Sequence, residues 1–323
     1  FAALLFTAAS LAFSLSIVFY EALLPHLATG AGLDALSARA YGLGYAGGGL
    51  LLVVNLAWVL KPGWFGLADA GQAVRLSFIS VGVWWMLFTI PLLRRVPEPP
   101  SSGAPAGVLA TLRRLRGTFN EIRSYPDLSL LLAAYWVYND GIGTIVKMAT
   151  AFGAEQGIGL THLIGALVVT QAVGVPCSYA FAAAAKRHGA RTLVLGALAG
   201  YALIAVGALF LRTALHFYLL AAAVGVVQGG AQALSRSLFA AMVPRHRAAE
   251  FFGFFGASGR LAGVVGPLVF GLTAQAAGTS RVGVASLVVF FVAGGLLLWR
   301  VDPAAGDAAA RRAERAAGWP AST

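Results

Sequence analysis

Long apolar blocks alternate with short polar segments along the chain. Each block has about 20 residues, the length that a helix needs to cross roughly 30 Å of hydrocarbon. Helices satisfy their own backbone hydrogen bonds in lipid, so each block is predicted to be a transmembrane helix. The nine predicted spans are residues 1–24, 41–60, 74–93, 128–150, 162–185, 192–211, 216–240, 254–277 and 282–299. The predicted fold is therefore all-α, a polytopic membrane helical bundle.

Composition agrees with a chain whose main solvent is lipid. Hydrophobic residues make up 59% of the 323 residues and charged residues only 11%, whereas a soluble domain carries about 25% charged residues. The net charge is +11, but the basic residues lie mostly in alternate loops, as the positive-inside rule requires, so a nucleic-acid partner is not expected. This asymmetry predicts that residues 94–127 and the C-terminus are cytosolic. Abundant Arg, Ala and Gly are typical of GC-rich bacterial genomes, and the predicted location is the bacterial cytoplasmic (inner) membrane.

The longest polar stretch divides the chain into two groups of spans. It begins with a Pro- and Ser-rich segment, residues 97–102, which is typical of a linker. Three spans precede it and six follow, which suggests a six-plus-six arrangement from which three spans are absent. The predicted units are residues 1–93 (remainder of an N-terminal bundle), 94–127 (cytosolic linker), 128–301 (six-helix bundle) and 302–323 (a solvated or loosely helical cytosolic tail).

Charged residues inside apolar spans are candidates for function, because each costs roughly 2.5 to 3.5 kcal/mol on insertion scales. Five such residues are found: Glu21, Asp140, Lys147, Glu250 and Arg260. Asp140 lies near the middle of its span, after Asn139 and before a glycine that weakens the helix. Asp140 is expected either to line a solute path or carry a coupling proton, or to have a structural role in which it pairs with Lys147 or Arg260.

Polar uncharged residues form a second class of candidates. Gln228 and Gln232 lie one turn apart on one helix face, and Gln171 lies near the middle of another span. Carboxamides at this depth bind polar solutes or bridge helices, and bridging bonds average only about 0.6 kcal/mol. The predicted substrate or coupling residues are Asn139, Asp140, Gln171, Gln228, Gln232 and Arg260, and the predicted gating or helix-pairing residues are Glu21, Lys147, Arg236 and Glu250.

Motifs for other chemistry are missing from the sequence. The chain has no phosphate-binding loop pattern, no His and Cys spacing for a metal, and no cluster of aspartates for diphosphate chemistry. Its single cysteine, Cys177, excludes an intramolecular disulfide or a thiolate cluster. The sequence predicts no catalytic residue, no metal and no cofactor, and an enzyme is disfavoured.

Two long stretches resemble a known family. They are Ala134–Gly159 (AYWVYNDGIGTIVKMATAFGAEQGIG) and Gln228–Gly271 (QGGAQALSRSLFAAMVPRHRAAEFFGFFGASGRLAGVVGPLVFG), and both are similar to the vacuole-effluxer family of the major facilitator superfamily. Shorter support comes from VFYEALLPHL, GYAGGGLLL and GVWWMLFTIPLL. The eukaryotic members are autophagy-related vacuolar amino-acid exporters.

The resemblance implies a major-facilitator-like bundle that works by alternating access. The first span here would correspond to the family's fourth, so the first three helices would be missing before Phe1. Two departures matter: Glu21 stands where the family tends to have Asn, and the segment 182–191 lacks the usual Gly and Asp pattern, which puts a gating contact there in doubt.

The leading hypothesis is a secondary active transporter of small solutes, with amino acids implied by the resemblance and a proton as a candidate coupling ion. Arg260 would bind a carboxylate and Asp140 an amine or a proton. The alternative is a non-transporting membrane receptor or scaffold that keeps the fold. A dry, closed bundle would favour the scaffold, and a polar cleft between the halves would favour transport.

Overall fold

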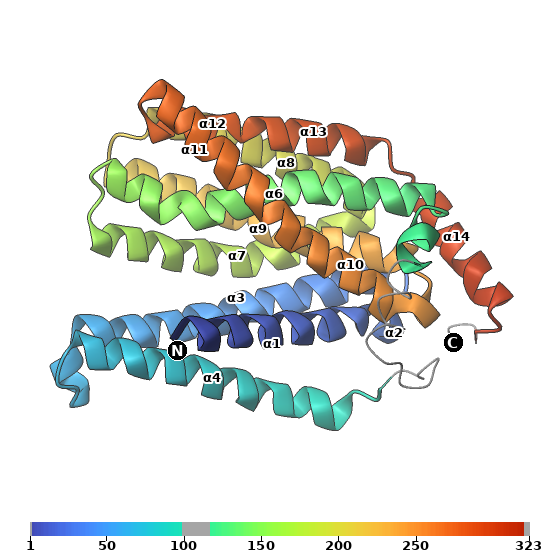
Figure 1. Ribbon diagram of the computed structural model, residues 1–323, viewed down its shortest axis with the longest axis horizontal. Helices are drawn as coiled ribbons and strands as arrows, with labels where there is room; N and C mark the ends of the chain where they lie inside the picture. Colours follow the sequence, from blue (N-terminus) through green and yellow to red (C-terminus); the bar gives the residue numbers. More distant parts are fainter. Residues whose placement is uncertain (1, 99–116, 320–323) are drawn as a thin grey trace.

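The computed structural model describes the backbone of residues 2–98 and 117–319, and the side chains of this part of the chain except for residues 2, 3 and 257–262. All regular elements within these limits are helices, which confirms the predicted all-α class. The helices run roughly side by side, as a bilayer-spanning bundle requires (Figure 1).

The first group of helices precedes the linker and is drawn in blue and cyan in Figure 1. It consists of α1 (Ala2–Ala22), the short α2 (Leu24–Leu27), α3 (Ala31–Leu60), a 3-10 turn η1 (Pro62–Phe65) and α4 (Ala70–Arg95). The helix α3 begins ten residues before its predicted apolar block, because its polar first turns extend beyond the hydrophobic stretch. We refer to these helices as the N-terminal group.

The second group, which we call the C-terminal group, follows a helical segment at residues 117–122. Its elements are α6 (Pro126–Glu155), α7 (Leu160–His188), α8 (Ala190–Gly207), η2 (Ala208–Phe210), α9 (Ala214–Met242), η3 (Arg245–Arg247), α10 (Ala248–Leu261), η4 (Ala262–Val264), α11 (Val265–Ala277), α12 (Ser280–Ser286), α13 (Val288–Trp299) and α14 (Pro303–Ala316). Among these helices, α7 and α9 pack against α3 and thereby join the two groups.

Seven helices in the described residues are long and apolar enough to cross a membrane. They cover Leu4–Leu27, Ala31–Leu60, Ala70–Arg95, Leu160–His188, Ala190–Phe210, Ala214–Met242 and Ser280–Trp299. The protein is therefore an integral, multi-pass membrane protein. The predicted count of nine is not confirmed, since α6 carries Asp140 and Lys147 in its middle and the predicted span 254–277 is interrupted.

That interruption has a local cause. Pro267 lacks the N–H that would bond to the carbonyl of Gly263, and its ring would clash with that carbonyl in a continuous helix. Gly263 accordingly leaves helical geometry, with ψ at 16°. The chain therefore forms two helices, α10 and α11, with a single 3-10 turn between them.

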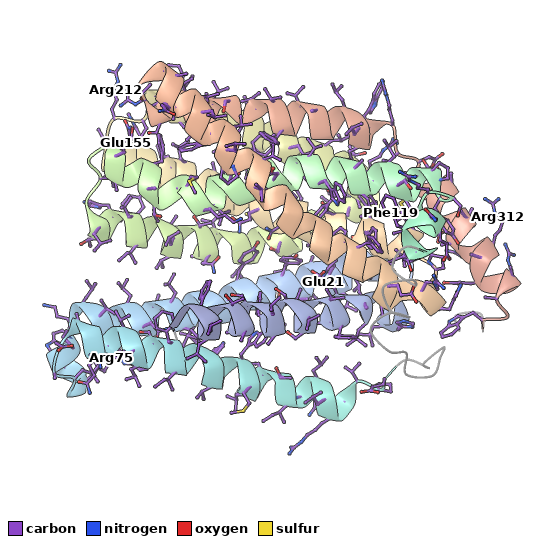
Figure 2. All side chains as sticks on the ribbon, in the orientation of Figure 1. Glu21, Arg75, Phe119, Glu155, Arg212 and Arg312 are labelled. Atoms are coloured by element: carbon purple, nitrogen blue, oxygen red, sulfur yellow. The ribbon has the colours of Figure 1, made fainter. Side chains whose placement is uncertain are left out.

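The two ends of the bundle differ in charge. We call the end that holds residues 23–30 and 243–247 and helix α14 the basic end, and the end that holds residues 61–69, 156–159 and 278–279 the far end. In Figure 2 the labelled Arg312 lies at the basic end, whereas Arg75, Glu155 and Arg212 lie at the far end. Charged groups thus flank the apolar middle, as expected for a membrane-spanning bundle.

The C-terminal segment, predicted as a solvated or loosely helical tail, contains the helix α14. Asp302 accepts hydrogen bonds from the N–H groups of Ala304 (2.9 Å) and Ala305 (3.2 Å) and so caps α14. Gly306 packs on Met242 of α9, and Ala310 is buried, because small residues let the two helices approach closely. On the exposed face Asp307 bonds to Arg311 at 2.9 Å and raises the pKa of that guanidinium.

Candidate functional site

A cavity of about 440 Å³ lies among the helices, in the half of the bundle toward the far end. Residues of α3, α6, α7, α8, α9, α11 and α12 line it, so it borders both helix groups. Its size falls within the range of about 300 to 1,000 Å³ that is usual for small-molecule sites. Most of the lining is aliphatic or aromatic.

The polar side chains of the cavity are gathered at one end. Tyr45 of α3, Gln171 of α7 and Gln228 of α9 are the lining residues of their helices that lie nearest the basic end. We call these three residues the cavity floor. The apolar residues, among them Phe152 and Phe217, lie farther along the same bundle toward the far end. A polar floor with apolar walls suits a solute that has one polar and one apolar end.

Below the floor, α3 and α9 are joined by side-chain hydrogen bonds. The hydroxyl of Tyr45 donates to Oε1 of Gln232 at 2.9 Å, and the hydroxyl of Ser37 donates to the carbonyl of Ala233 at 2.7 Å. The hydroxyl of Ser237 donates to the carboxylate of Asp34. We call this set of bonds the α3–α9 contact. It joins α3 to α9 between the cavity and the basic end.

Arg236 lies at the centre of the α3–α9 contact and is only 5% exposed. Its Nε donates to the Ser37 hydroxyl at 3.0 Å, and its Nη2 donates to the Ser37 carbonyl at 3.2 Å. The guanidinium also lies 4.8 Å from the ring centroid of Tyr41 and 5.8 Å from that of Tyr20. Arg236 thus connects α9 to both α3 and α1, which is the geometry of a helix-pairing or gating residue.

Glycines allow α9 to approach its neighbours. A Cβ at Gly225 would stand 2.7 Å from the backbone oxygen of Thr170 in α7, closer than real contacts allow. A Cβ at Gly229 would meet the Ser178 hydroxyl. These two glycines are four residues apart, a spacing that favours close helix packing, and the helix that they approach is α7.

Asp140 does not line the cavity. It is 3% exposed, and its Oδ2 accepts a hydrogen bond from the N–H of Gly266 at 2.8 Å. That N–H belongs to the first turn of α11 and has no partner within its own helix. Asp140 therefore caps the helix that begins after the break. Its Oδ1 is buried and has no hydrogen-bond partner in the described part of the structure.

The other charges predicted at mid-membrane are placed as follows. Lys147 forms no ion pair with Asp140 in the described residues, and its Nζ lies 2.7 Å from where a Cβ on Gly263 would stand, beside the helix break. Asn139 is half-buried, and Glu21 is half-buried in α1, next to Tyr20. The backbone of Arg260 belongs to α10, but its side chain is outside the described set.

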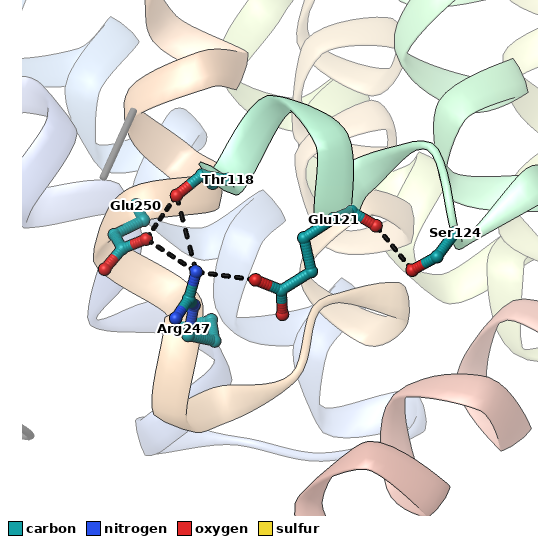
Figure 3. A network of polar contacts seen from close by, with 5 residues as sticks. All are labelled: Thr118, Glu121, Ser124, Arg247 and Glu250. Carbon is teal, nitrogen blue, oxygen red and sulfur yellow. Dashed lines mark hydrogen bonds and ion pairs between the residues drawn. The ribbon is translucent and has the colours of Figure 1, made fainter. Parts of the chain in front are cut away.

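Glu250 belongs to a separate polar network at the basic end (Figure 3). Arg247 forms ion pairs with Glu121 at 2.6 Å and with Glu250 at 3.0 Å. The hydroxyl of Thr118 donates to Glu250. The network connects the end of the linker with the start of α10, so Glu250 lies in a helix–linker junction rather than in the cavity.

The structure adds residues that the sequence did not single out. Tyr45, Ser37 and Asp34 come from α3, where no candidate was predicted. Tyr45 could have been noticed in the sequence, because it is the one large residue beside Gly44, Ala46 and Gly47. The described residues contain no group of three or more His, Cys, Asp or Glu side chains that could hold a metal ion.

Comparisons with known proteins agree with this architecture. The model of the family described as "Vacuole effluxer Atg22 like" matches residues 1–311. The MFS-type transporter YxiO of Bacillus subtilis (strain 168) is 38% identical over 303 residues, which are 91% of this chain and 69% of that protein. Autophagy-related protein 22 of Yarrowia lipolytica is 26% identical over 280 residues, covering 73% of this chain and 45% of that protein.

A second fungal relative, autophagy-related protein 22-2 of Aspergillus clavatus, is 26% identical over 274 residues, 76% of this chain and 44% of that protein. The chain thus spans less than half the length of these two fungal relatives. YxiO is named as a transporter and the family model as an effluxer, which supports a membrane transporter rather than an enzyme. The match over nearly the whole chain confirms the resemblance drawn from the two long motifs, and the protein belongs to the vacuole effluxer Atg22-like family.

Proposed function

We propose that the protein is a secondary active transporter that moves a small solute across the membrane by alternating access. The observation that carries this proposal is the cavity between the N-terminal and C-terminal groups, whose floor residue Tyr45 also belongs to the α3–α9 contact. A solute in the cavity therefore touches a residue of the closure below it. That is the coupling which alternating access requires.

The proposed cycle has two moving units. Residues 1–93 and 128–301 are the units, residues 94–127 the linker and residues 302–323 a cytosolic tail. In the conformation described here the basic end is closed, and the solute exchanges toward the far end. Opening of the basic end would break the bonds of Arg236 to Ser37 and of Ser237 to Asp34. With the basic end in the cytosol of a bacterial cell, these bonds form the cytosolic gate.

The scaffold hypothesis predicts a dry and closed centre. The presence of a cavity disfavours the scaffold hypothesis. The cavity is not a continuous polar cleft, however, because most of its lining is apolar. Amino acids as solutes and a proton as coupling ion remain predictions. Asp140 is the described carboxylate that would carry the proton, since its buried Oδ1 has no hydrogen-bond partner among the described residues.

A disulfide across the α3–α9 contact tests the proposal. Asp34 and Ser237 are in hydrogen-bond contact, so cysteines at both positions, with Cys177→Ala as background, are expected to cross-link on oxidation. Uptake of radiolabelled amino acids, singly and as a mixture, is then measured in proteoliposomes. Oxidation should stop transport and a reductant should restore it, because the basic end can no longer open.

The single variants Asp34→Cys and Ser237→Cys are the matched controls and should not respond to oxidation. Undiminished transport by a protein shown to be cross-linked would exclude the proposed gate. The four variants also separate two kinds of failure: no uptake of any amino acid by any of them, including the background, would exclude amino acids as the transported solute.

A further inference from the structure

A second cavity, of about 620 Å³, lies at the basic end of the bundle. Most of its lining comes from three parts of the chain: residues 25–34 of the N-terminal group, residues 237–245 of the C-terminal group, and α14. We call it the basic-end cavity. The proposed transport cycle gives this cavity no ligand.

The basic-end cavity lies at the level where membrane-spanning helices end. Two candidate spans, Leu4–Leu27 and Ala214–Met242, end in the segments that line it, and a third, Ala31–Leu60, begins there. Apolar side chains such as Leu33 and Leu238 line it together with charged ones. Phospholipid head groups lie at this level of a bilayer, between the hydrocarbon core and water. The cavity is therefore placed to receive a lipid head group.

The carboxylates in the lining all have partners. Asp34 belongs to the α3–α9 contact. Asp307 forms an ion pair with Arg311 at 2.9 Å. Glu314 accepts a hydrogen bond from the backbone N–H of Arg245 at 2.8 Å. These three acidic groups are therefore already engaged within the protein.

Two of the three arginines in the lining have no such partner. The guanidinium groups of Arg245 and Arg315 form no hydrogen bond and no ion pair in the part of the chain that the structure describes. All 12 Asp and Glu residues of the sequence lie in that part, so none of their carboxylates neutralises these two groups. Arg245 is half-buried and Arg315 is exposed. The cavity thus offers an anion two uncompensated positive charges.

The chemistry of these groups and the depth of the cavity favour a phospholipid. Guanidinium groups bind phosphate oxygens through paired hydrogen bonds, and basic pockets at the ends of transmembrane helices suit anionic lipid head groups. A free phosphate ion would use the charges but not the apolar lining. A head group that carries its own ammonium would bring no net charge to the guanidinium groups.

We infer that the basic-end cavity binds the phosphate of an anionic phospholipid, with Arg245 and Arg315 as its ligands. A lipid bound here contacts the N-terminal group, the C-terminal group and α14 at once, and so holds these three parts together. The inference is independent of the solute that the protein carries.

Isothermal titration calorimetry with the full chain in detergent tests this inference. The probe is dihexanoylphosphatidylglycerol, compared with dihexanoylphosphatidylcholine and with inorganic phosphate. The phosphatidylglycerol should bind at a single site, and the affinity for each of the other two should be at least about tenfold lower. Phosphatidylcholine has the same chains without net charge, and inorganic phosphate has the charge without chains. Added salt should weaken the binding of phosphatidylglycerol, because salt screens charges near the surface.

Two variants and a matched control locate the site. Arg245→Gln and Arg315→Gln should each lower the affinity for phosphatidylglycerol by about tenfold, and Gln at position 245 keeps the backbone N–H that bonds to Glu314. Arg312→Gln is the control. Arg312 belongs to the same helix at the basic end (Figure 2) but does not line the cavity, so this variant should bind like the unmodified chain. Unfolding midpoints measured without lipid verify that all three variants are folded, and the exposed Arg315 carries the test should Arg245→Gln not fold.

Four results would overturn the inference. Absence of binding, or equal affinity for phosphatidylglycerol and phosphatidylcholine, would exclude an anionic lipid site. Equal affinity for inorganic phosphate would indicate a site for a free anion, and an equal loss in Arg312→Gln and Arg315→Gln would indicate general surface charge. None of these results bears on the disulfide test of transport, so the two proposals fail separately.

Discussion

The two halves of the α3, α7 and α9 assembly have opposite character. Toward the basic end these helices touch through hydrogen bonds between side chains and through glycines, and Arg236 is buried among them. Toward the far end the same helices present Leu52, Leu163 and Phe217 to an open cavity. Small and polar residues therefore form the contacts in the half toward the basic end, while bulky apolar residues line the cavity in the half toward the far end.

This comparison teaches how one set of helices can provide both a gate and a binding site. Close approach of two helix backbones requires small residues. The hydrogen bonds that stabilise such a contact require buried polar groups with partners. In the far half α7 and α9 still approach each other at Gly225, and the hydroxyl of Thr170 donates to the carbonyl of Ala221, but the cavity lies beside them. The boundary between the halves lies at Tyr45, which lines the cavity with its ring and donates its hydroxyl to Gln232.

The largest effect is expected from removal of the buried guanidinium. Arg236→Ala would leave the Ser37 carbonyl and hydroxyl without their charged donor, at a cost of about 3 kcal/mol to the closed arrangement. Ala38 is fully buried at this contact, so maleimide modification of Ala38→Cys should accelerate strongly in the Arg236→Ala background. Arg236→Lys, which keeps the charge, should fall in between. An unchanged rate in both would show that hydrogen bonds to Arg236 do not hold this half closed.

A smaller effect is expected from crowding the α7–α9 interface. A Cβ at Gly225 would collide with the Thr170 backbone oxygen at 2.7 Å, and such overpacking costs about 1 to 3 kcal/mol. Gly225→Ala should lower the thermal unfolding midpoint in detergent. Gly143→Ala is the matched control, because nothing lies within 4 Å of its added Cβ. Equal midpoints for the two variants would argue against a tight α7–α9 contact at Gly225.

The variant Tyr45→Phe tests the boundary between the two halves. It removes one hydrogen bond between uncharged groups, worth about 1 kcal/mol, and keeps the ring. The unfolding midpoint should fall slightly, and the rate of transport should change because the link between cavity and contact is lost. Tyr179→Phe, a half-exposed tyrosine of α7, is the control. A transport rate unchanged in Tyr45→Phe would separate the cavity from the gate.

The smallest effect on stability is expected from Asp140→Asn. The amide oxygen of Asn can still accept from the Gly266 N–H, so the α11 cap is weakened by less than about 1 kcal/mol. The same variant cannot carry a proton. Retention of pH-driven transport would show that Asp140 acts only as a cap, whereas its loss with an unchanged melting point would support proton coupling.

Much of the fold could be predicted, because lipid imposes a simple pattern. Apolar length located most spans, and two motifs identified the family. The break at Gly263 was only suggested by Pro267, since a proline in an apolar block bends a helix as often as it ends one. Because of this break, Asp140 caps α11. That contact depends on how α6 and α11 pack, so it could not be predicted from the positions of the residues in the sequence.

The candidate site was predicted in part. Gln171 and Gln228 were predicted from their similar depth on different spans, and both lie at the cavity floor. Asp140 was expected to line a solute path or carry a proton, or to pair with Lys147 or Arg260, whereas its carboxylate accepts a hydrogen bond from the Gly266 N–H of α11. Ser37 and Asp34 were missed because α3 begins before its apolar block, and a serine at a polar helix start carries no distinctive signal.

The segment that follows α14 has a practical consequence for experiments. The ring of Trp319 lies 6.3 Å from His26 of the N-terminal group and 6.1 Å from His246 of the C-terminal group. A rocking motion of the two groups would pull these three rings apart. A spectroscopic label at residue 319 would therefore follow each opening and closing, and a bulky fusion directly after it would hinder the movement it was meant to observe.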